Sequence, residues 1–252
     1  MISPRAPLIA FVLAAVSALL FPAAPAASGF EDASGIARRA LELSPGGNWM
    51  LTGLLTTKPA ENAKPDGGVA LGRRPITIQL LALPDGTRQV VYRSEREDRF
   101  VYGMRFLFPP VGAAGSVRIL KLDGKYPVSD PQALFLGSGF TLEDLSLGFL
   151  AWKSQELLGL DTHRDRTCWR IVSRPEKSDA SAYARVEAWV DQEYLALLRA
   201  IARDAEGNTL REFDVRGFQK LEEVWMLKRL DLSAPPLGVT TRLDIQNAKR
   251  EE

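Results

Sequence analysis

Residues 195–220 read LALLRAIARDAEGNTLREFDVRGFQK, and this stretch decides the fold class. Apolar and polar residues alternate on both sides of the segment AEGN at 205–208, whose glycine and asparagine favour a tight turn. Two strands joined by such a turn form an antiparallel hairpin. The same alternation, interrupted by clusters of Gly, Pro, Asp and Asn, continues outward in both directions. The sequence therefore predicts a mainly β fold built on an antiparallel sheet.

Nine further runs have the alternation of strands. They lie at residues 49–57, 75–83, 88–95, 100–108, 116–122, 168–173, 182–191, 224–232 and 240–246. The runs 88–95 and 100–108 are close enough in sequence to pair as neighbours. One apolar face of such a sheet needs a cover.

Two segments with helical spacing can supply that cover, which makes the fold class α+β. In residues 30–43 the apolar side chains recur at helical intervals, and SPGG at 44–47 ends the helix. The second segment, 141–158, begins with Thr141, which can cap a helix, and Asp144 follows three residues later. We expect one helix over each segment.

The amino terminus has the features of a cleavable secretory signal. Arg5 supplies the positive charge, and LIAFVLAAVSALLF at 8–21 is an uncharged apolar run that is shorter than the roughly 20 residues of a membrane span. Ala24 and Ala26 then fit the small-residue rule for cleavage after Ala26. We expect residues 1–26 to be a signal peptide and residues 27–252 to be one domain, exported to the periplasm.

Charge and cysteine content restrict what the mature chain can do. Removal of Arg5 would leave 31 basic and 31 acidic residues, and a balanced charge argues against a nucleic-acid partner. The single cysteine, Cys168, excludes an internal disulfide. Because no cysteine stands at the expected cleavage site directly after the apolar run, we expect the mature amino terminus to carry no lipid, so the protein would be soluble.

The residues that most resemble catalytic or metal-binding groups have simpler interpretations. Glu143 and Asp144 are adjacent, so on a helix they point about 100° apart, and a role at a helix start is favoured. His163 is the only histidine and is expected on the surface, Cys168 is expected to be buried in a strand, and GSG at 137–139 is expected to be a flexible turn. We therefore predict no catalytic residue, no metal site, no cofactor and no enzymatic activity.

The run FVYGMRFLF at 100–108 concentrates bulky apolar residues on one face of a strand. Phe100, Tyr102, Met104, Phe106 and Phe108 alternate there, and methionine among aromatic rings suits an adaptable apolar surface. These side chains could line a cavity or form an ordinary packed core. Four further candidates for a cavity lining lie on other predicted elements: Trp49, Leu51, Phe149 and Trp152.

In its second half the chain resembles the outer-membrane lipoprotein-sorting proteins, the LolA-like periplasmic carriers. The motif LGSGFTLEDL at 136–145 is similar to a glycine, an aromatic residue and then E-D-L in that family. TCWRIV at 167–172, YARVEAWVD at 183–191 and EVWM at 223–226 follow in the family's order. The segment 116–132 departs from the pattern, since related chains usually carry a longer aromatic strand pair there.

The resemblance implies an incomplete β-barrel, a strongly curved antiparallel sheet whose concave face is covered by helices. It further implies a monomeric carrier that shields lipoprotein or other lipid acyl chains between sheet and helices. An inner-membrane transporter would be the donor and an outer-membrane protein the acceptor. The departure at 116–132 leaves the cargo open. The competing interpretation is a fully packed structural or interaction module of the cell envelope.

Overall fold

One large sheet organises the protein. The structure is a computed structural model and describes residues 32–95, 101–113, 115–122, 124, 128, 130–177, 179, 181–221 and 224–251. The strands are β1 Asn48–Pro59, β2 Gly72–Ala82, β3 Arg88–Glu95, β4 Val101–Phe108, β5 Arg118–Lys121, β6 Ser154–His163, β7 Arg166–Arg174, β8 Arg185–Asp191, β9 Leu197–Arg203, β10 Thr209–Leu221, β11 Val224–Ala234 and β12 Val239–Glu251. The helices are α1 Ala33–Glu42 and α2 Leu142–Ser146, with short 3-10 turns η1 Phe135–Gly137, η2 Gly148–Ala151 and η3 Pro235–Leu237.

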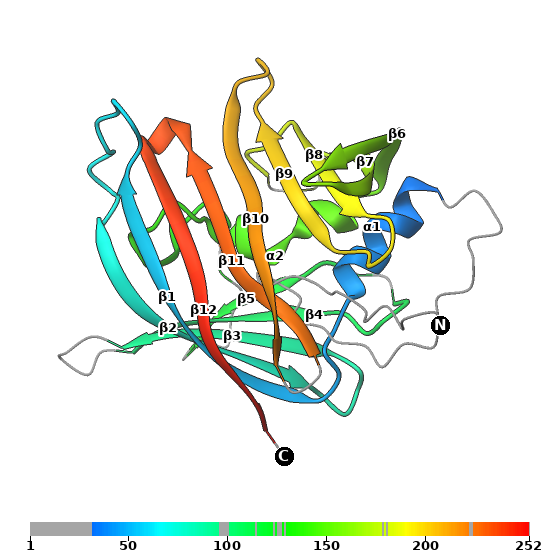
Figure 1. Ribbon diagram of the computed structural model, residues 1–252, viewed down its shortest axis with the longest axis horizontal. Coiled ribbons are helices and arrows are strands. Elements are labelled where there is room, and N and C mark those ends of the chain that lie inside the picture. The colour runs from blue at the N-terminus through cyan, green and yellow to red at the C-terminus, as the bar shows by residue number, and fades with distance from the viewer. Residues whose placement is uncertain are drawn as a thin grey trace, which may run out of the picture.

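The twelve strands form a single antiparallel sheet in the order β5-β4-β3-β2-β1-β12-β11-β10-β9-β8-β7-β6. Every neighbour in the sheet is also a neighbour in sequence except β1 and β12, which join the two halves along their length. Figure 1 shows the sheet curving so that β2 to β4 cross beneath the upright strands, with α1 and α2 behind those strands. Within the described residues β5 and β6 have no outer partner, so the sheet is open. The predicted incomplete β-barrel is confirmed.

Alternation along each strand divides the sheet into an inner and an outer face. In β1 the side chains of Trp49, Leu51 and Leu55 are buried, whereas those of Thr52 and Lys58, at alternate positions of the same strand, are exposed. The inner side chains of the long strands other than β6 merge with those of α1, α2 and η1 into one apolar cluster. The hydrophobic core therefore fills the concave side of the sheet.

The amino-terminal helix is confirmed, with bounds three residues inside the predicted 30–43 at its start. The carboxylate of Asp32 caps α1 by accepting from the backbone N–H of Gly35 at 2.7 Å. Ile36, Ala37 and Ala40 are buried on one side of the helix, which packs on β6, β8 and η2. Apolar periodicity and the stop signal SPGG were sufficient to place this helix, and the Asp32 cap was found in the structure.

The second predicted helix, over 141–158, is wrong in length. Only α2 is α-helical, and it ends because Leu147 takes a left-handed conformation at φ 48°. The chain continues through η2 and then becomes β6, which pairs with β7 from Ser154 onward. The apolar spacing that indicated one long helix is satisfied instead by a short helix, a 3-10 turn and the first part of a strand.

Two smaller expectations also need correction. His163, predicted on the solvated surface, lies at the end of β6 with its side chain 14% exposed and its Nε2 3.1 Å from Asp214 Oδ1. The turn at 137–139 is packed and not loose, since Gly139 donates its N–H to Thr241 Oγ1 at 2.9 Å and is buried. A Cβ on Gly139 would lie 2.9 Å from that hydroxyl. The signal peptide at 1–26, and Phe100, lie outside the described residues.

Candidate functional site

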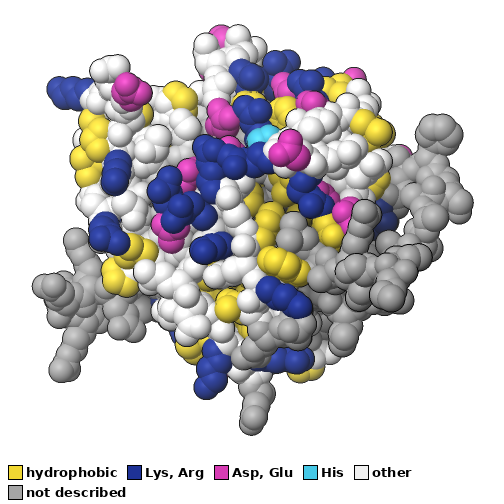
Figure 2. Space-filling view, in the orientation of Figure 1, with side chains coloured by type: hydrophobic (Ala, Val, Ile, Leu, Met, Phe, Trp, Pro, Cys, Tyr) yellow, Lys and Arg dark blue, Asp and Glu magenta, His cyan; other side chains and the backbone are white. Residues whose placement is uncertain are grey.

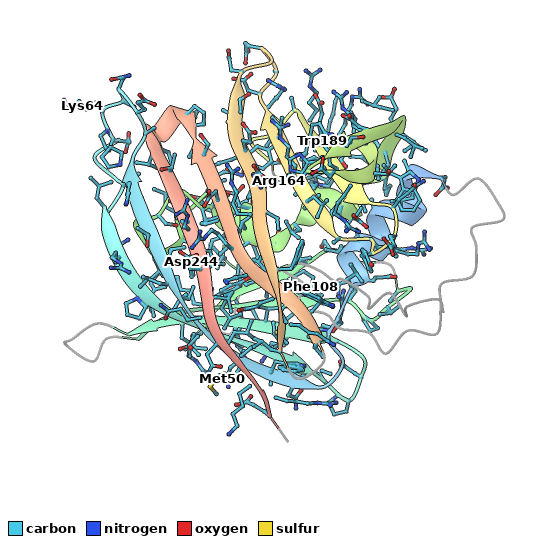
Figure 3. The ribbon with its side chains drawn as sticks, viewed as in Figure 1. Met50, Lys64, Phe108, Arg164, Trp189 and Asp244 are labelled. Atoms are coloured by element: carbon cyan, nitrogen blue, oxygen red, sulfur yellow. The ribbon has the colours of Figure 1, made fainter. Side chains whose placement is uncertain are left out.

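The apolar residues predicted to line a cavity converge on the concave side of the sheet. Met104, Phe106 and Phe108 of β4 are buried, and Tyr102 at the start of the same face is partly buried. The other four candidates join the same cluster from three different elements: Trp49 and Leu51 from β1, Phe149 from η2 and Trp152 just after it. The structure thus brings together all eight side chains, packed in one interior. Phe108 lies within the curve of the sheet (Figure 3).

Aromatic rings hold the covering segment against this interior. Phe135 of η1 meets Tyr92 of β3 edge-on at 5.5 Å between ring centroids and Tyr102 at 5.9 Å. Tyr92 also packs edge-on against Phe106 at 5.4 Å. Such pairs add modest, orientation-dependent attraction to the burial of the rings. Phe135 and Tyr92 were missed as candidates because neither belongs to a run with a conspicuous apolar face.

A cavity of about 770 Å³ opens at one end of the interior, between α1 and the loop after β4. Its walls are α1, the loop 109–117, the segment 146–153 and the loop after β7. Of the predicted residues only Trp152 lines it, beside the apolar side chains of Leu41, Leu150 and Val117. The volume is within the range of small-ligand sites. We call this cavity the mouth.

Two hydrogen bonds, made by the side chains of Glu42 and Arg88, join α1 to the opposite wall of the mouth, and we call this pair of contacts the clasp. Glu42 Oε1 accepts from the backbone N–H of Gly112 at 2.8 Å, and Arg88 donates to the carbonyl oxygen of Leu41 at 3.0 Å. The Arg88 guanidinium also lies over the Phe108 ring, 5.4 Å from its centroid. Burial lowers the pKa of Arg88 from its ordinary value, with Glu42 opposing the shift. The mouth is therefore closed on this side by a few polar contacts and not by a backbone ladder.

Asp144 anchors α2 to the sheet from within the protein. Its carboxylate accepts from the backbone N–H of Thr141 at 2.8 Å and from the hydroxyl of Tyr183, and it lies 3.4 Å from Nε of Arg211 on β10. Thr141 returns the contact by accepting from the Asp144 N–H at 3.1 Å, which completes a capping box. Burial raises the pKa of Asp144, and the Arg211 charge opposes that shift. The predicted role at a helix start is confirmed, and the buried charge of Arg211 is an addition that sequence reasoning missed.

A family model described as an uncharacterized protein matches residues 123–252, slightly more than half of the chain. The chain belongs to this family. Comparison with curated proteins gave no match.

Three solved structures have the same arrangement of strands. A putative outer membrane lipoprotein-sorting protein domain from Vibrio parahaemolyticus aligns with a TM-score of 0.67 at 16% identity, covering 87% of this chain and 92% of that one. A DUF1329 family protein from Desulfovibrio piger aligns at 0.60 and 16% identity, with the same two coverages. A LolA superfamily protein from Nitrosomonas europaea aligns at 0.59 and 15% identity, over 88% of this chain and 94% of that one. The fold is LolA-like, as the sequence resemblance predicted.

The convex face of this LolA-like sheet carries a network of ion pairs. Arg164 and Arg216 both contact Asp214, and Arg216 and Arg242 both contact Asp231, at 2.7 to 3.1 Å. Figure 2 shows these basic and acidic side chains gathered over β10 to β12, with the single histidine among them. Arg164 of this network is labelled in Figure 3, as is Asp244, which pairs with Arg229.

A shallow groove of about 680 Å³ crosses the same face. Its four carboxylates are those of Glu212, Asp214, Asp231 and Asp244, and each is paired with an arginine. Exposed ion pairs of this kind contribute little energy each, but they keep an uncovered sheet face polar. The groove is therefore part of a solvated surface, in contrast to the apolar interior on the other side.

The described residues contain no group of three or more His, Cys, Asp or Glu side chains that could hold a metal ion. Cys168 is buried, as predicted, and burial raises the pKa of its thiol to about 11. No helix in the described part of the chain has the length and apolar content needed to span a membrane. Burial raises the pKa values of both Asp144 and Tyr183, and the Tyr183 hydroxyl donates to the Asp144 carboxylate.

Proposed function

We propose that this chain is a periplasmic carrier that shields lipoprotein acyl chains, or those of another lipid, between the curved sheet and its covering helices. The proposal includes export by a signal peptide at 1–26, removal of that peptide, and a soluble, unlipidated domain at 27–252. An inner-membrane transporter would load the carrier and an outer-membrane acceptor would unload it. The first of the structures compared above is named as a lipoprotein-sorting domain, which agrees with this assignment.

One observation carries the proposal: eight bulky apolar side chains from β1, β4 and the covering segment 149–152 meet on the concave side of an open sheet. An interior of this kind matches the requirement of the cargo. Each methylene moved out of water gains about 0.8 kcal/mol, so a chain of sixteen carbons gains roughly 12 kcal/mol. That gain would offset the exposure of the apolar side chains of the cover, such as Ile36 and Phe149, when the cargo displaces them.

The interior is closely packed around Phe106 and Phe108, both 0% exposed. A cargo chain must therefore take the place of covering side chains. We assign this arrangement to the empty, closed carrier, in which α1 and α2 occupy the space that the acyl chains would fill. The mouth beside α1, where Glu42 and Arg88 form the clasp, is where we expect the cover to separate.

The proposed carrier is not an enzyme. Asp144 is committed to Thr141, Tyr183 and Arg211, and Glu143 accepts from the side-chain amide of Gln132. Burial raises the pKa of Glu143 as well, but its carboxylate serves to hold the start of α2 against the segment before it. These carboxylates position the cover.

The test is a matched pair of charge substitutions, one in the mouth and one on the outer face of β4. Trp152 lines the mouth and is partly buried, whereas Leu107 is on the face of β4 opposite to Phe106 and is partly exposed. We expect wild-type protein to bind a fluorescent fatty-acid analogue that palmitate displaces. Trp152→Glu should abolish that binding while circular dichroism stays unchanged, because the open mouth admits water to the carboxylate, and Leu107→Glu should bind normally.

Two outcomes would contradict the carrier. One is wild-type protein that binds no analogue and carries no lipid when it is isolated gently from the periplasm and analysed by mass spectrometry. The other is a folded Trp152→Glu protein that binds the analogue as tightly as wild type, because a charge in the mouth is unfavourable for an entering acyl chain.

Either outcome would favour the competing function, an interaction module. That alternative has an observation of its own, since β6 is an edge strand with exposed Leu157, Leu158 and Leu160.

A further inference from the structure

The far halves of β10 and β11 leave the sheet as a two-stranded arm. β9 pairs with β10 only over residues 209–214, and β12 pairs with β11 only over 229–234. Among the described strands, residues 215–221 have no partner on β9 and residues 224–228 have none on β12, and the two stretches pair with each other over 218–221 and 224–227. Figure 1 shows this part of β10 and β11 diverging from β12 on one side and from β9 on the other. We call these two stretches the arm.

The base of the arm is irregular. The register between β10 and β11 shifts on both sides of Gly217, where the two strands lose their one-to-one pairing. A Cβ placed on Gly217 would meet nothing within 4 Å, so the space beside this residue is open. Bulges of this kind bend a strand and locally weaken its ladder. The ladder around Gly217 is therefore the place where the arm would bend relative to the rest of the sheet.

Apolar side chains of the arm form one wall of the interior. Met226 and Leu227 are 1% and 0% exposed and belong to the same cluster as Phe106, and Phe218 and Trp225 pack against it. The side-chain amide of Gln219 joins the arm to β12 by donating to the carbonyl oxygen of Ile245 at 3.3 Å. Lifting the arm would expose apolar surface but would break no backbone pairing with β9 or β12. An acyl chain that replaced those contacts would offset this exposure.

Trp225 carries a polar atom that packing alone does not explain. Its indole Nε1 is buried and has no acceptor among the described residues. An indole N–H can only donate, and a buried donor without a partner is unfavourable by about 1–3 kcal/mol. Buried tryptophan N–H groups usually find an acceptor. A ligand that is apolar over most of its length and carries one acceptor oxygen would pack against the apolar side chains of the arm and accept from this N–H group.

We propose that an acyl chain enters beneath the arm and that Trp225 Nε1–H donates a hydrogen bond to the carbonyl oxygen at the head of that chain. The ligand class is therefore an ester or amide of a long-chain fatty acid, and not a free hydrocarbon. This inference rests on the proposed carrier function and adds to it a second movable wall, distinct from α1. Trp225 belongs to the arm, so its indole N–H would move together with the arm when the ligand enters.

The test of Trp225 compares two probes that differ only in the acceptor. Methyl palmitate has an ester carbonyl, and hexadecane has none. Trp225→Phe keeps an aromatic ring and removes the donor. It should weaken the affinity for methyl palmitate by about three- to tenfold and change the affinity for hexadecane by less than about twofold. Trp189→Phe is the matched control, because Trp189 lies on β8 and donates to Asp161 at 2.9 Å. This control substitution should leave the affinity for both probes unchanged.

The test of the arm is hydrogen exchange with and without saturating methyl palmitate. We expect the exchange of amides in 215–221 and 224–228 to change on binding, while that of the β8–β9 hairpin stays constant. If both probes bind but the arm is unaffected, or if Trp225→Phe weakens the two probes equally, the inference is overturned and the carrier function stands. If wild-type protein binds neither probe, the carrier function itself fails.

Discussion

Removal of Arg211 gives the sharpest test of how the cover is held on the sheet. Its Nε lies 3.4 Å from Asp144 Oδ2, and the two side chains are 9% and 0% exposed. Two unit charges at that separation attract by about 5 kcal/mol at an effective dielectric constant of about 20. Arg211→Met keeps the length of the side chain and leaves the Asp144 charge buried without its partner. We expect a loss of about 3–5 kcal/mol in the free energy of unfolding.

The measurement is urea unfolding at pH 7.5, followed by circular dichroism and tryptophan fluorescence. Arg216→Met is the matched control, since Arg216 also contacts two carboxylates, each at 3.0 Å, but its side chain is 42% exposed on the convex face. That substitution should cost less than about 1 kcal/mol. Adding Asp144→Asn to Arg211→Met should recover part of the loss, because it removes the stranded charge. A cost for Arg211→Met below about 1 kcal/mol, or equal to that of Arg216→Met, would refute the reasoning.

Three further expectations follow from single residues. Burial raises the pKa of Asp144, so protonation of this carboxyl stabilises the folded protein below the ordinary pKa of about 4, and this contribution is lost as the pH rises through the raised pKa. Urea midpoints measured from pH 4 to 8 should therefore decline in the wild type, and Asp144→Asn should flatten that decline. The Cys168 thiol, with its pKa raised to about 11, should react with a disulfide reagent at pH 8 only in urea, and rapid reaction of the folded protein would contradict its burial. Gly53→Ala would place a Cβ 2.5 Å from the carbonyl oxygen of Asp244, so thermal unfolding should show a loss of about 1–3 kcal/mol, and an unchanged midpoint would argue against this close approach of β1 and β12.

Local pattern predicted most of the elements because each strand has its own alternation. The runs 88–95 and 100–108 pair as expected, and the hairpin around 205–208 joins β9 to β10. The prediction failed at 141–158, where helical spacing is shared by α2, η2 and the start of β6. Periodicity cannot distinguish these possibilities, since the left-handed residue Leu147 that ends α2 has no sequence signal of its own.

Contacts between distant residues could not be predicted in the same way. Asp144 could be placed at a helix start from the capping pattern, but its ion pair with Arg211 requires the position of β10 relative to α2. The mouth was missed for the same reason, because its walls come from α1, the loop after β4 and the segment around Trp152. Each of these segments is ordinary when it is considered by itself.

The sequence by itself determined the fold class, the first helix, the strand faces and the apolar character of β4, because all of these depend on neighbours two to four residues away. Tertiary structure alone decided that Phe106 and Trp152 share one interior, that His163 meets Asp214, and that the outer parts of β10 and β11 leave the sheet. These features depend on the curvature of twelve strands and on where each pairing stops. Alternation along a strand carries no information about either.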